Sequence, residues 1–395
     1  MRPKILVTFI ESGKGHIMSA QSVYESLVEK YGDRYDIEKV YIMSADGNEK
    51  LMAVERFLTK QCQNTNKVQF FGKFIFPFIH FMGGQKLMRW VHKNVCSGSF
   101  KAILKAFKDR KPDVIVSTHY YISLAAGEYK RQIDPDCVVV TYNPDNMLHP
   151  FWDTREGYFL VNSDRAYKQA MHRRFRPGHV VRVPLSVRKE VERCNISREE
   201  LRRKHGLPED KFTVTLADGA YMYGRAKKYT KKLIKSGLPL TLLVITGYHE
   251  KNYRYFARRM HKVPDNITLK LYKFTDYAYE LYGASDVFIT KGGPNAVLDS
   301  VYMDTPVMIN YTPHMIEEET YKLFVKRFGC GVGAFTARRA VKLLRGYIAD
   351  PSALRPFADG IAALKAGGNG ADKIADFVAE KLEEKEKAAV ADQSV

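Results

Sequence analysis

Short apolar runs alternate along most of this chain with polar segments that have helical spacing. The run KILVTFI at residues 4–10 is almost continuously apolar, as in a strand buried on both faces of a parallel sheet. Residues 17–31 then place apolar side chains at helical spacing. Further strands of the same kind are predicted at residues 35–43, 112–119, 136–143, 157–163 and 179–184. Strands that alternate with helices predict a parallel sheet covered on both faces.

The alternation stops in a polar, charged stretch at residues 186–198 and then starts again. The second series of strands is predicted at residues 211–219, 238–247, 266–274, 284–293 and 306–311. We therefore predict an α/β protein with two Rossmann-like halves. The predicted boundaries are 1–185 for an N-terminal domain, 186–198 for a linker, 199–368 for a C-terminal domain, and 369–395 for a C-terminal helix and polar tail.

The net charge of the chain indicates which kinds of partner it attracts. Lysine and arginine outnumber the acids 63 to 44, which gives a net charge of +19 and favours polyanions such as nucleic acid, anionic lipid or nucleotide substrates. None of the five cysteines forms a C-x-x-C pair, so neither a zinc site nor a disulfide framework is predicted. The first apolar run is too short for a signal peptide, and we expect a reducing cytosol.

A glycine-rich turn with a histidine follows the first strand. Its sequence GKGH lacks the spacing of a Walker loop, and Met18 stands where a dinucleotide fingerprint has its third glycine. What remains is a tight turn before a helix start, which can receive an anion. His16 in this turn is a candidate general base. The alternative is that Gly13 and Gly15 only turn the chain and His16 caps the helix.

A second turn of this kind lies at residues 288–300. Pro294 suits the first turn of a helix, and Lys291 adds a positive charge at the end of the strand. Asp299 follows about one and a half turns into the helix, where a carboxylate can reach a ribose diol. The alternative is an ordinary helix start with a capping asparagine and a surface acid.

Together these features resemble the GT-B glycosyltransferases, whose two Rossmann-like domains face each other across a cleft. Within that fold the chain is most similar to the group of monogalactosyldiacylglycerol synthases, bacterial processive diacylglycerol glucosyltransferases and the lipid-II-forming N-acetylglucosaminyltransferase, glycosyltransferase family 28-like enzymes. Four motifs carry the resemblance: GKGHIMSA at 13–20, STH at 117–119, HPFW at 149–152 and TKGGPNAVLD at 290–299.

The resemblance implies an inverting, metal-independent transfer of a hexose from a UDP-sugar to a membrane lipid such as diacylglycerol, with no resident cofactor. It implies His16 and Asp145 as catalytic residues, and His119, His149 and Trp152 as acceptor-binding residues. Phe274 would border the base and Asp299 would bind the ribose. The full implied donor site is Gly15, Gly219, Phe274, Lys291, Gly293, Pro294, Asn295, Asp299 and Glu317.

The chain departs from the family pattern at three places. Tyr142 stands where the family has an aspartate, and Asp145 in the following loop is the candidate substitute. The stretch PHMIEEE lacks the glutamine of the family's sugar-reading sequence, which leaves Glu317 or Glu318. Asp299 replaces a glutamate. The identity of the donor sugar therefore stays open.

The segment FFGKFIFPFIHF at residues 70–81 contains six phenylalanines with cations close by. Pro77 interrupts it, and it is too short to span a bilayer, which takes about 20 apolar residues. Aromatic residues beside cations suit a membrane interface, although a pair of core helices is the alternative. The predicted membrane residues are Phe70, Phe71, Phe74, Phe76, Phe78 and Trp90. They predict peripheral association with an anionic surface on the cytoplasmic side of the cell membrane.

Two other function classes stay open. One is a different GT-B enzyme that acts on a nucleotide sugar, either an epimerase or a transferase with a soluble acceptor. The other is a non-enzymatic basic binding protein, which only the positive charge supports. Because the chain has no recognisable nucleic-acid motif, no nucleic-acid partner is predicted.

Overall fold

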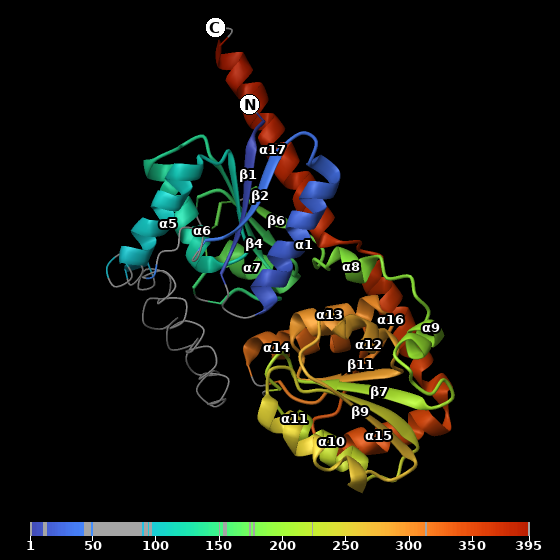
Figure 1. The fold of residues 1–395 in the computed structure, drawn as a ribbon. Helices are drawn as coiled ribbons and strands as arrows, with labels where there is room; N and C mark the ends of the chain where they lie inside the picture. Colours follow the sequence, from blue (N-terminus) through green and yellow to red (C-terminus); the bar gives the residue numbers. More distant parts are fainter. Residues whose placement is uncertain are drawn as a thin grey trace. The chain divides into compact units, whose positions relative to one another are not determined.

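The computed structural model describes residues 2–10, 14–42, 49, 89–90, 94, 97–149, 151–152, 156–173, 175–176, 178–222, 224–312 and 314–393. Contacts divide the chain into an N-terminal unit, residues 1–189 with 369–395, and a C-terminal unit, residues 190–368. Each unit contains a six-stranded sheet in which all described pairs are parallel (Figure 1). The predicted class, an α/β protein with two Rossmann-like domains, is therefore confirmed.

The N-terminal unit has the strand order β2-β1-β3-β4-β5-β6. Its strands are β1 (Lys4–Phe9), β2 (Asp36–Tyr41), β3 (Val114–Ser117), β4 (Val138–Asn143), β5 (Tyr158–Val161) and β6 (Val180–Arg182). Its helices are α1 (Lys14–Tyr31), α5 (Ser97–Arg110), α6 (Tyr120–Gln132), α7 (Asp164–His172) and α17 (Gly370–Gln393). All six strands lie within segments that the sequence pattern predicts as strands.

Successive residues of β1 face opposite layers of helices, and both layers are apolar and buried. Ile5 and Val7 of β1 pack with α1 and α17, whereas Leu6 between them packs with α5 and α6. This burial on both faces explains why β1 is a continuous apolar run rather than an alternating one.

The C-terminal helix α17 completes the core of the N-terminal unit, where it lies beside α1 (Figure 1). Tyr31 of α1 donates a hydrogen bond to Asp376 Oδ1 at 2.8 Å, and Arg34 pairs with Glu383 at 2.7 Å. The side chains that α17 buries recur at helical spacing: Ala371, Ile374, Ala375, Val378, Ala379 and Leu382. The last segment of the chain therefore belongs to the same folded unit as the first.

The C-terminal unit has the strand order β12-β11-β10-β7-β8-β9. Its strands are β7 (Phe212–Ala217), β8 (Leu240–Ile245), β9 (Ile267–Tyr272), β10 (Val287–Thr290), β11 (Val307–Ile309) and β12 (Gly331–Gly333). Its helices of four or more residues are α9 (Arg198–Lys204), α10 (Ala226–Ile234), α11 (Glu250–Ala257), α12 (Ala278–Gly283), α13 (Pro294–Tyr302), α14 (Met315–Thr320), η3 (Tyr321–Arg327), α15 (Ala337–Ala349), η4 (Pro351–Leu354) and α16 (Arg355–Lys365), with α8 (Lys189–Glu192) at the boundary and the short turn η2 (Met260–Lys262) before β9. Strand β12 was not predicted, because two of its three residues are glycines.

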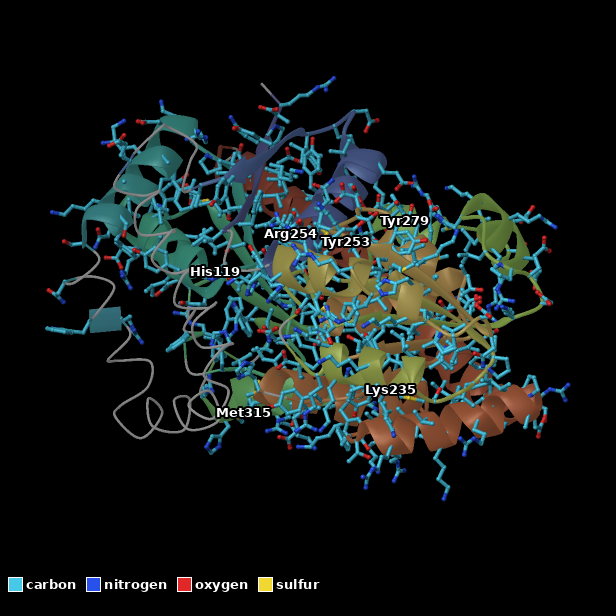
Figure 2. All side chains as sticks on the ribbon, turned by 60° about the horizontal axis from the view of Figure 1, so that its bottom comes forward. His119, Lys235, Tyr253, Arg254, Tyr279 and Met315 are labelled. Carbon is cyan, nitrogen blue, oxygen red and sulfur yellow. The ribbon has the colours of Figure 1, made fainter. Side chains whose placement is uncertain are left out.

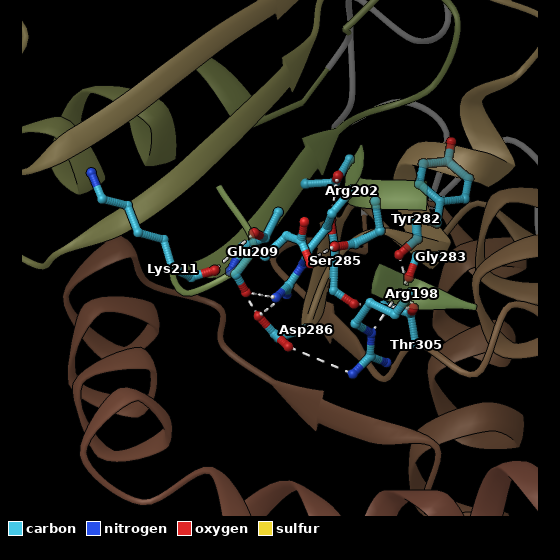
Figure 3. A network of polar contacts seen from close by, with 12 residues as sticks. Arg198, Arg202, Glu209, Lys211, Tyr282, Gly283, Ser285, Asp286 and Thr305 are labelled. Carbon is cyan, nitrogen blue, oxygen red and sulfur yellow. Dashed lines mark hydrogen bonds and ion pairs between the residues drawn. The ribbon is translucent and has the colours of Figure 1, made fainter. Parts of the chain in front are cut away.

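A buried polar network attaches α9 to the start of this sheet (Figure 3). Arg202 pairs with Asp286 at 2.7 Å, and Arg202 Nε donates to the carbonyl oxygen of Ala284 at 3.0 Å. The same Asp286 carboxylate accepts the backbone N–H of Thr213 at 2.7 Å. One carboxylate thus holds the entry to β7 and the entry to β10 together, next to each other in the sheet.

Each sheet has a point at which the direction of strand addition reverses. In the N-terminal unit the chain passes from β1 to β2 and then returns to β3 on the other side of β1. In the C-terminal unit β8 and β9 follow β7 on one side, and β10 lies on the other. Ligands of open α/β sheets bind at the carboxyl ends of the strands beside such a point. The ends of β1 and β3, and of β7 and β10, are therefore where sites are expected.

Most of the predicted membrane segment lies outside the described residues. This applies to Phe70, Phe71, Phe74, Phe76 and Phe78. Trp90 is described, and its side chain is exposed at 58%. In the part of the chain that the structure describes, no helix has the length and apolar character needed to cross a membrane.

Candidate active site

His16 lies at the reversal point of the N-terminal sheet, in the first turn of α1. Its Nδ1 is 2.7 Å from the carbonyl oxygen of Thr118, directly after β3. Because a carbonyl oxygen only accepts, Nδ1 carries the hydrogen and Nε2 keeps its lone pair. Thr118 Oγ1 donates in return to the carbonyl oxygen of His16 at 3.0 Å. The side chain of His16 is thus bound to the neighbouring strand end and does not cap its own helix.

The protonation state of His16 suits a base. Burial lowers the pKa of the imidazole below its usual 6.5, and the hydrogen bond to Thr118 opposes this only in part. The ring is therefore mainly neutral at pH 7, with a fixed tautomer. A neutral imidazole whose Nε2 has no hydrogen-bond partner among the described residues can accept a proton from a hydroxyl group.

Aromatic rings connect His16 to the residues implied for acceptor binding. The rings of His16 and His119 are 4.8 Å apart, and Tyr120 lies 4.3 Å from His119. Tyr120 in turn contacts His149 at 5.4 Å, and His149 lies 5.5 Å from Trp152. His16, His119, His149 and Trp152, taken from three separate motifs, are therefore brought together. Tyr120 was not identified from the sequence, where an aromatic residue at a helix start gives no signal.

The side chains predicted to bind the acceptor, or the loops that carry them, are held by hydrogen bonds and packing within the same unit. His119, which is labelled in Figure 2, caps α6, since its Nδ1 accepts the backbone N–H of Tyr121 at 3.3 Å. Arg173 donates to the carbonyl oxygen of His149 at 2.8 Å and so holds the loop that carries it. Burial, followed by the charges of His16 and Arg173, lowers the pKa of His149 well below 6.5. Trp152 is completely buried and supports this cluster from the core.

Tyr142, at the position of the family's aspartate, and Asp145, its candidate substitute, lie in different surroundings. Tyr142 faces the α1 and α17 layer, where it is buried and its hydroxyl accepts the backbone N–H of Ser186 at 3.3 Å. Asp145 is buried in the loop after β4, and Asn143 accepts its backbone N–H at 3.2 Å. The pKa of Tyr142 is raised mainly because the side chain is buried, and the nearby charge of Asp145 adds to this rise. The tyrosine at the family's aspartate position is therefore a core residue.

A buried ion pair marks the reversal point of the C-terminal sheet. Lys291 Nζ, directly after β10, lies 2.8 Å from Glu317 Oε1, and their side chains are only 15% and 8% exposed. Gly219, after β7, adjoins the same lysine, since a Cβ there would lie 3.6 Å from Lys291 Cε. Among the described residues the second oxygen, Glu317 Oε2, is buried without a hydrogen-bond partner. Three residues predicted to bind the donor, Gly219, Lys291 and Glu317, therefore lie together here. Among the described residues, Glu317 Oε2 is left able to accept a hydrogen bond.

The charge of Glu317 is maintained by its partner. Burial alone would raise the pKa of this carboxyl group, but Lys291 and His314 outweigh the burial, and the pKa lies below its usual 4.5. The carboxylate is therefore ionised at neutral pH and can accept hydrogen bonds from sugar hydroxyl groups.

The start of α13 supplies an anion-binding geometry. Gly293 is its N-cap residue, no side chain caps the helix, and Pro294 occupies the first turn. Gly292 has φ +83°, a conformation that favours glycine, whereas Gly293 has φ −63°, which any residue adopts. A Cβ at Gly293 would meet no atom of the described residues within 4 Å. The predicted Asn295 and Asp299 follow on this helix, one turn apart and half-buried.

Three aromatic residues gather after β7, β8 and β9. Tyr248 stacks on Phe274 with ring centres 4.4 Å apart and planes at 9°, and Tyr221 lies 5.5 Å from Tyr248. Tyr248 is 49% exposed, so the stack presents an aromatic surface. Phe274 was predicted from the family pattern, whereas Tyr221 and Tyr248 were not identified. The sequence feature that could have identified Tyr221 and Tyr248 is their position just after predicted strands.

Two further polar residues were missed. Asp218 is buried after β7, where its carboxylate accepts Asn310 Nδ2 at 3.1 Å and the backbone N–H of Ala226 at 2.6 Å. Burial raises the pKa of Asp218, although these hydrogen bonds and Lys291 oppose it. Asp218 and Asn310 each directly follow a strand, and this position in the sequence could have identified them as candidate site residues. They fix the loop that carries Gly219.

The described residues contain no group of three histidine, cysteine or acidic side chains that could hold a metal ion. The groups at the two reversal points are instead a fixed histidine with aromatic neighbours in one unit and a helix start with a buried ion pair in the other.

Two known sequences are related to most of the chain. A probable monogalactosyldiacylglycerol synthase of rice is 24% identical over 361 residues, 86% of this chain and 67% of that protein. The processive diacylglycerol β-glucosyltransferase of Bacillus cereus is 21% identical over 334 residues, 84% of this chain and 81% of that protein. No family model matches the chain. The chain is a distant relative of both groups, which confirms the predicted resemblance.

Solved structures agree on the fold. MurG of Acinetobacter baumannii covers 96% of this chain and 99% of its own, with a TM-score of 0.58 and 11% identity. The Anabaena protein HepE, crystallised with UDP, covers 97% and 100%, with a TM-score of 0.59 and 11% identity. The fold is thus GT-B, as predicted.

Proposed function

We propose that this GT-B glycosyltransferase transfers a hexose from a UDP-sugar to the hydroxyl group of a membrane lipid, with inversion at the anomeric carbon. The relatives named as diacylglycerol and monogalactosyldiacylglycerol enzymes support the lipid acceptor, and HepE, which binds UDP, supports the donor. The observation that carries the chemistry is the hydrogen bond from His16 to Thr118.

In this proposal the N-terminal unit takes the acceptor. His16 Nε2 accepts the proton of the acceptor hydroxyl as its oxygen attacks the anomeric carbon and the bond to the diphosphate breaks. The bond from Nδ1 to Thr118 holds the ring in the tautomer that this step needs. His119, Tyr120 and His149 shape the surroundings of the hydroxyl, and Trp152 holds them from the core.

The C-terminal unit would bind the donor. The start of α13 and Lys291 stabilise the negative charge left on the diphosphate, since helix N-termini and cations favour anions. Asp299 would bind the ribose and the stack of Phe274 on Tyr248 would border the base. Glu317 Oε2 would accept a sugar hydroxyl. We expect donor binding to be the same with and without a chelator of divalent metals.

A donor screen tests the proposal as a whole. The purified full chain is incubated with a lipid extract and each of a panel of labelled UDP-sugars, and the label in the lipid phase is measured. We expect one sugar to enter a lipid product. Release of UDP with all label in the aqueous phase would mean that the sugar goes to water or to a soluble acceptor, and isomerisation of the sugar would identify an epimerase. Either result would contradict the proposal.

Asp299→Ala should weaken UDP binding by about 1–3 kcal/mol, the usual cost of leaving a buried polar partner unpaired. Isothermal titration calorimetry of the full chain measures this. The control is Asp265→Ala, an exposed acid that lies before β9 at the opposite edge of the sheet, where no change is expected. No affinity for UDP in the wild type, or strict dependence on a divalent metal, would show that the donor site is wrongly assigned.

Gly293→Ala should fold normally but bind UDP about 1–3 kcal/mol more weakly, the range of overpacking costs. Its backbone conformation accepts any residue and its Cβ has room, so a loss points to a ligand that occupies this space. The control is Gly346→Ala in α15, where a Cβ also meets nothing within 4 Å of the described atoms. Wild-type affinity in Gly293→Ala would mean that no phosphate approaches this position.

A further inference from the structure

A dense group of cations lies on the C-terminal unit outside the candidate site. Helix α10 buries Ala226, Tyr229, Thr230 and Leu233, which recur at intervals of three and four residues. Apart from the half-buried Ile234, its other positions and the residue that follows the helix carry lysines: Lys227, Lys228, Lys231, Lys232 and Lys235. The sequence therefore forms one apolar stripe and one continuous basic stripe.

Helix α15 extends this basic stripe. Its buried residues Ala337, Val341 and Leu344 belong to the same core cluster as Tyr229 and Leu233 of α10, so both helices cover the same face of the sheet (Figure 1). Its exposed cations are Arg338, Arg339, Lys342 and Arg345. A hollow of about 790 Å³ is lined by the α10 lysines and the first residues of α15. We name these nine cations the α10–α15 face; Lys235 is labelled in Figure 2.

The charges of the α10–α15 face are not compensated within the unit. Neither helix contains an acidic residue. In the described ranges none of the nine cations forms an ion pair, whereas Lys322 of the same unit contacts both Glu318 and Glu319 at 2.9 Å. Like charges one turn apart repel each other and destabilise a helix. An anionic partner that covers the face would remove this repulsion.

We propose that the α10–α15 face docks on an anionic lipid surface. The proposal rests on the proposed lipid acceptor, which brings the protein to a membrane, and it assigns the C-terminal unit a contact separate from the predicted phenylalanine segment. Lysine predominates on α10, and its compact, hydrated charge suits diffuse attraction to headgroups more than bidentate recognition of bases.

The aromatic residue at this face also favours lipid over nucleic acid. Lys227, Lys231 and Arg259 lie 4.3, 4.7 and 4.0 Å from the ring centre of Tyr255. Three cations thus gather around this ring, whereas single-stranded nucleic acid needs aromatic faces on which bases stack. An aromatic ring among cations is instead typical of membrane-interface surfaces.

The test removes three exposed lysines whose side chains form no hydrogen bond, ion pair or ring contact with the described residues: Lys228→Gln, Lys232→Gln and Lys235→Gln. Each lysine at an anionic leaflet contributes roughly fivefold to the partition coefficient, so the triple variant should bind about 100-fold more weakly. Co-sedimentation of the full chain with phosphatidylcholine–phosphatidylglycerol vesicles measures this. Binding of the wild type should fall steeply at about 1 M salt, where the screening length is about 3 Å.

The matched control removes three exposed lysines of the same unit elsewhere: Lys251→Gln, Lys262→Gln and Lys326→Gln. It should lose less than about fivefold. Equal losses in both variants would mean that only net charge acts, and unchanged binding of the α10 variant would also overturn the proposal. A loss that appears only with a short single-stranded RNA would assign the face to nucleic acid.

These vesicles contain neither acceptor lipid nor sugar nucleotide, so the result is independent of catalysis. UDP titration of both variants should match the wild type, which also verifies that the unit is folded. If the wild type transfers no sugar while the vesicle result holds, the proposed function fails and the docking face stands. If transfer to lipid is found and the α10 variant binds vesicles normally, only the docking face is contradicted.

Discussion

His16→Ala should lower the turnover of sugar transfer by about 10²–10⁴-fold, the range of general acid–base contributions. The reason is the loss of Nε2, the nitrogen left open because Nδ1 donates to the carbonyl oxygen of Thr118 at 2.7 Å. The measurement is the initial rate of labelled lipid formation with saturating donor and acceptor. Affinity for UDP should change little, since all predicted donor residues except Gly15 lie in the C-terminal unit.

His16→Asn separates catalysis from structure. Its amide Nδ2 can donate to Thr118 in place of Nδ1, but it offers no base, so the variant should fold as the wild type and still lose activity. His172→Ala, an exposed histidine of α7, is the control and should retain full turnover. Turnover close to wild type in His16→Asn would remove His16 from the mechanism.

The pH dependence provides a second test of the same histidine. Because burial lowers the pKa of His16, the base form persists below pH 6.5 and is lost as the pH falls through the folded pKa. The acidic limb of kcat/KM should therefore have its midpoint below 6.5. The residual activity of His16→Ala should lack this limb. A midpoint above 6.5 would contradict the assigned protonation state.

Glu317→Ala should lower the free energy of unfolding by about 3–5 kcal/mol, the usual cost of removing one partner of a buried ion pair. Lys291 Nζ, 2.8 Å from Glu317 and largely buried, would be left with an uncompensated charge. Urea denaturation of the full chain measures the change. Glu318→Ala is the control on the same helix. Its pair with Lys322 is about half exposed, so about 0–1 kcal/mol is expected.

The double variant Lys291→Met with Glu317→Leu distinguishes structure from function. Replacing a buried pair with apolar residues of similar volume is often nearly neutral, so most of the stability should return. Binding of the UDP-sugar should not return, because both the cation and the carboxylate that we assign to the donor are gone. If the double variant binds the UDP-sugar as tightly as the wild type, the Lys291–Glu317 pair stabilises the fold but does not bind the donor.

The stability that Glu317 contributes should depend on pH in a defined direction. Its pKa is lowered in the folded chain, so the contribution is present above the ordinary value of 4.5 and is lost as the pH falls through the folded pKa. The difference in unfolding free energy between wild type and Glu317→Ala should therefore narrow below pH 4.5. A constant difference down to pH 3 would mean that the Lys291 pair is not its source.

Local sequence pattern determined most of the architecture. Strands such as β1 and β8 are continuous apolar runs because both faces of a parallel sheet are covered, and this leaves a signal in a single segment. The glycine-rich segments at the starts of α1 and α13 could be recognised for the same reason, since a strand end and the helix start that follows it are neighbours in the chain. The GT-B class and the family resemblance followed from these local motifs.

The tertiary structure decided which of these residues act together. His16 and Thr118 are 102 residues apart, and only the adjacency of β1 and β3 gives the imidazole the fixed tautomer that the proposed base needs. Lys291 and Glu317 form one buried pair because the turn after β10 lies against α14, whereas Glu318, next in sequence, faces Lys322. The pattern alone could not choose between the two glutamates, because burial depends on contacts that are distant in sequence.

The roles of Tyr142 and α17 show the same limit. Tyr142 occupies the family's aspartate position, yet its orientation toward the α1 and α17 layer makes it part of the core. Helix α17 could be recognised as a helix from its spacing, but not as the neighbour of α1, which lies more than 300 residues earlier in the sequence. Periodicity determines which face of an element is apolar; the partner of that face is chosen by the packing of the whole chain.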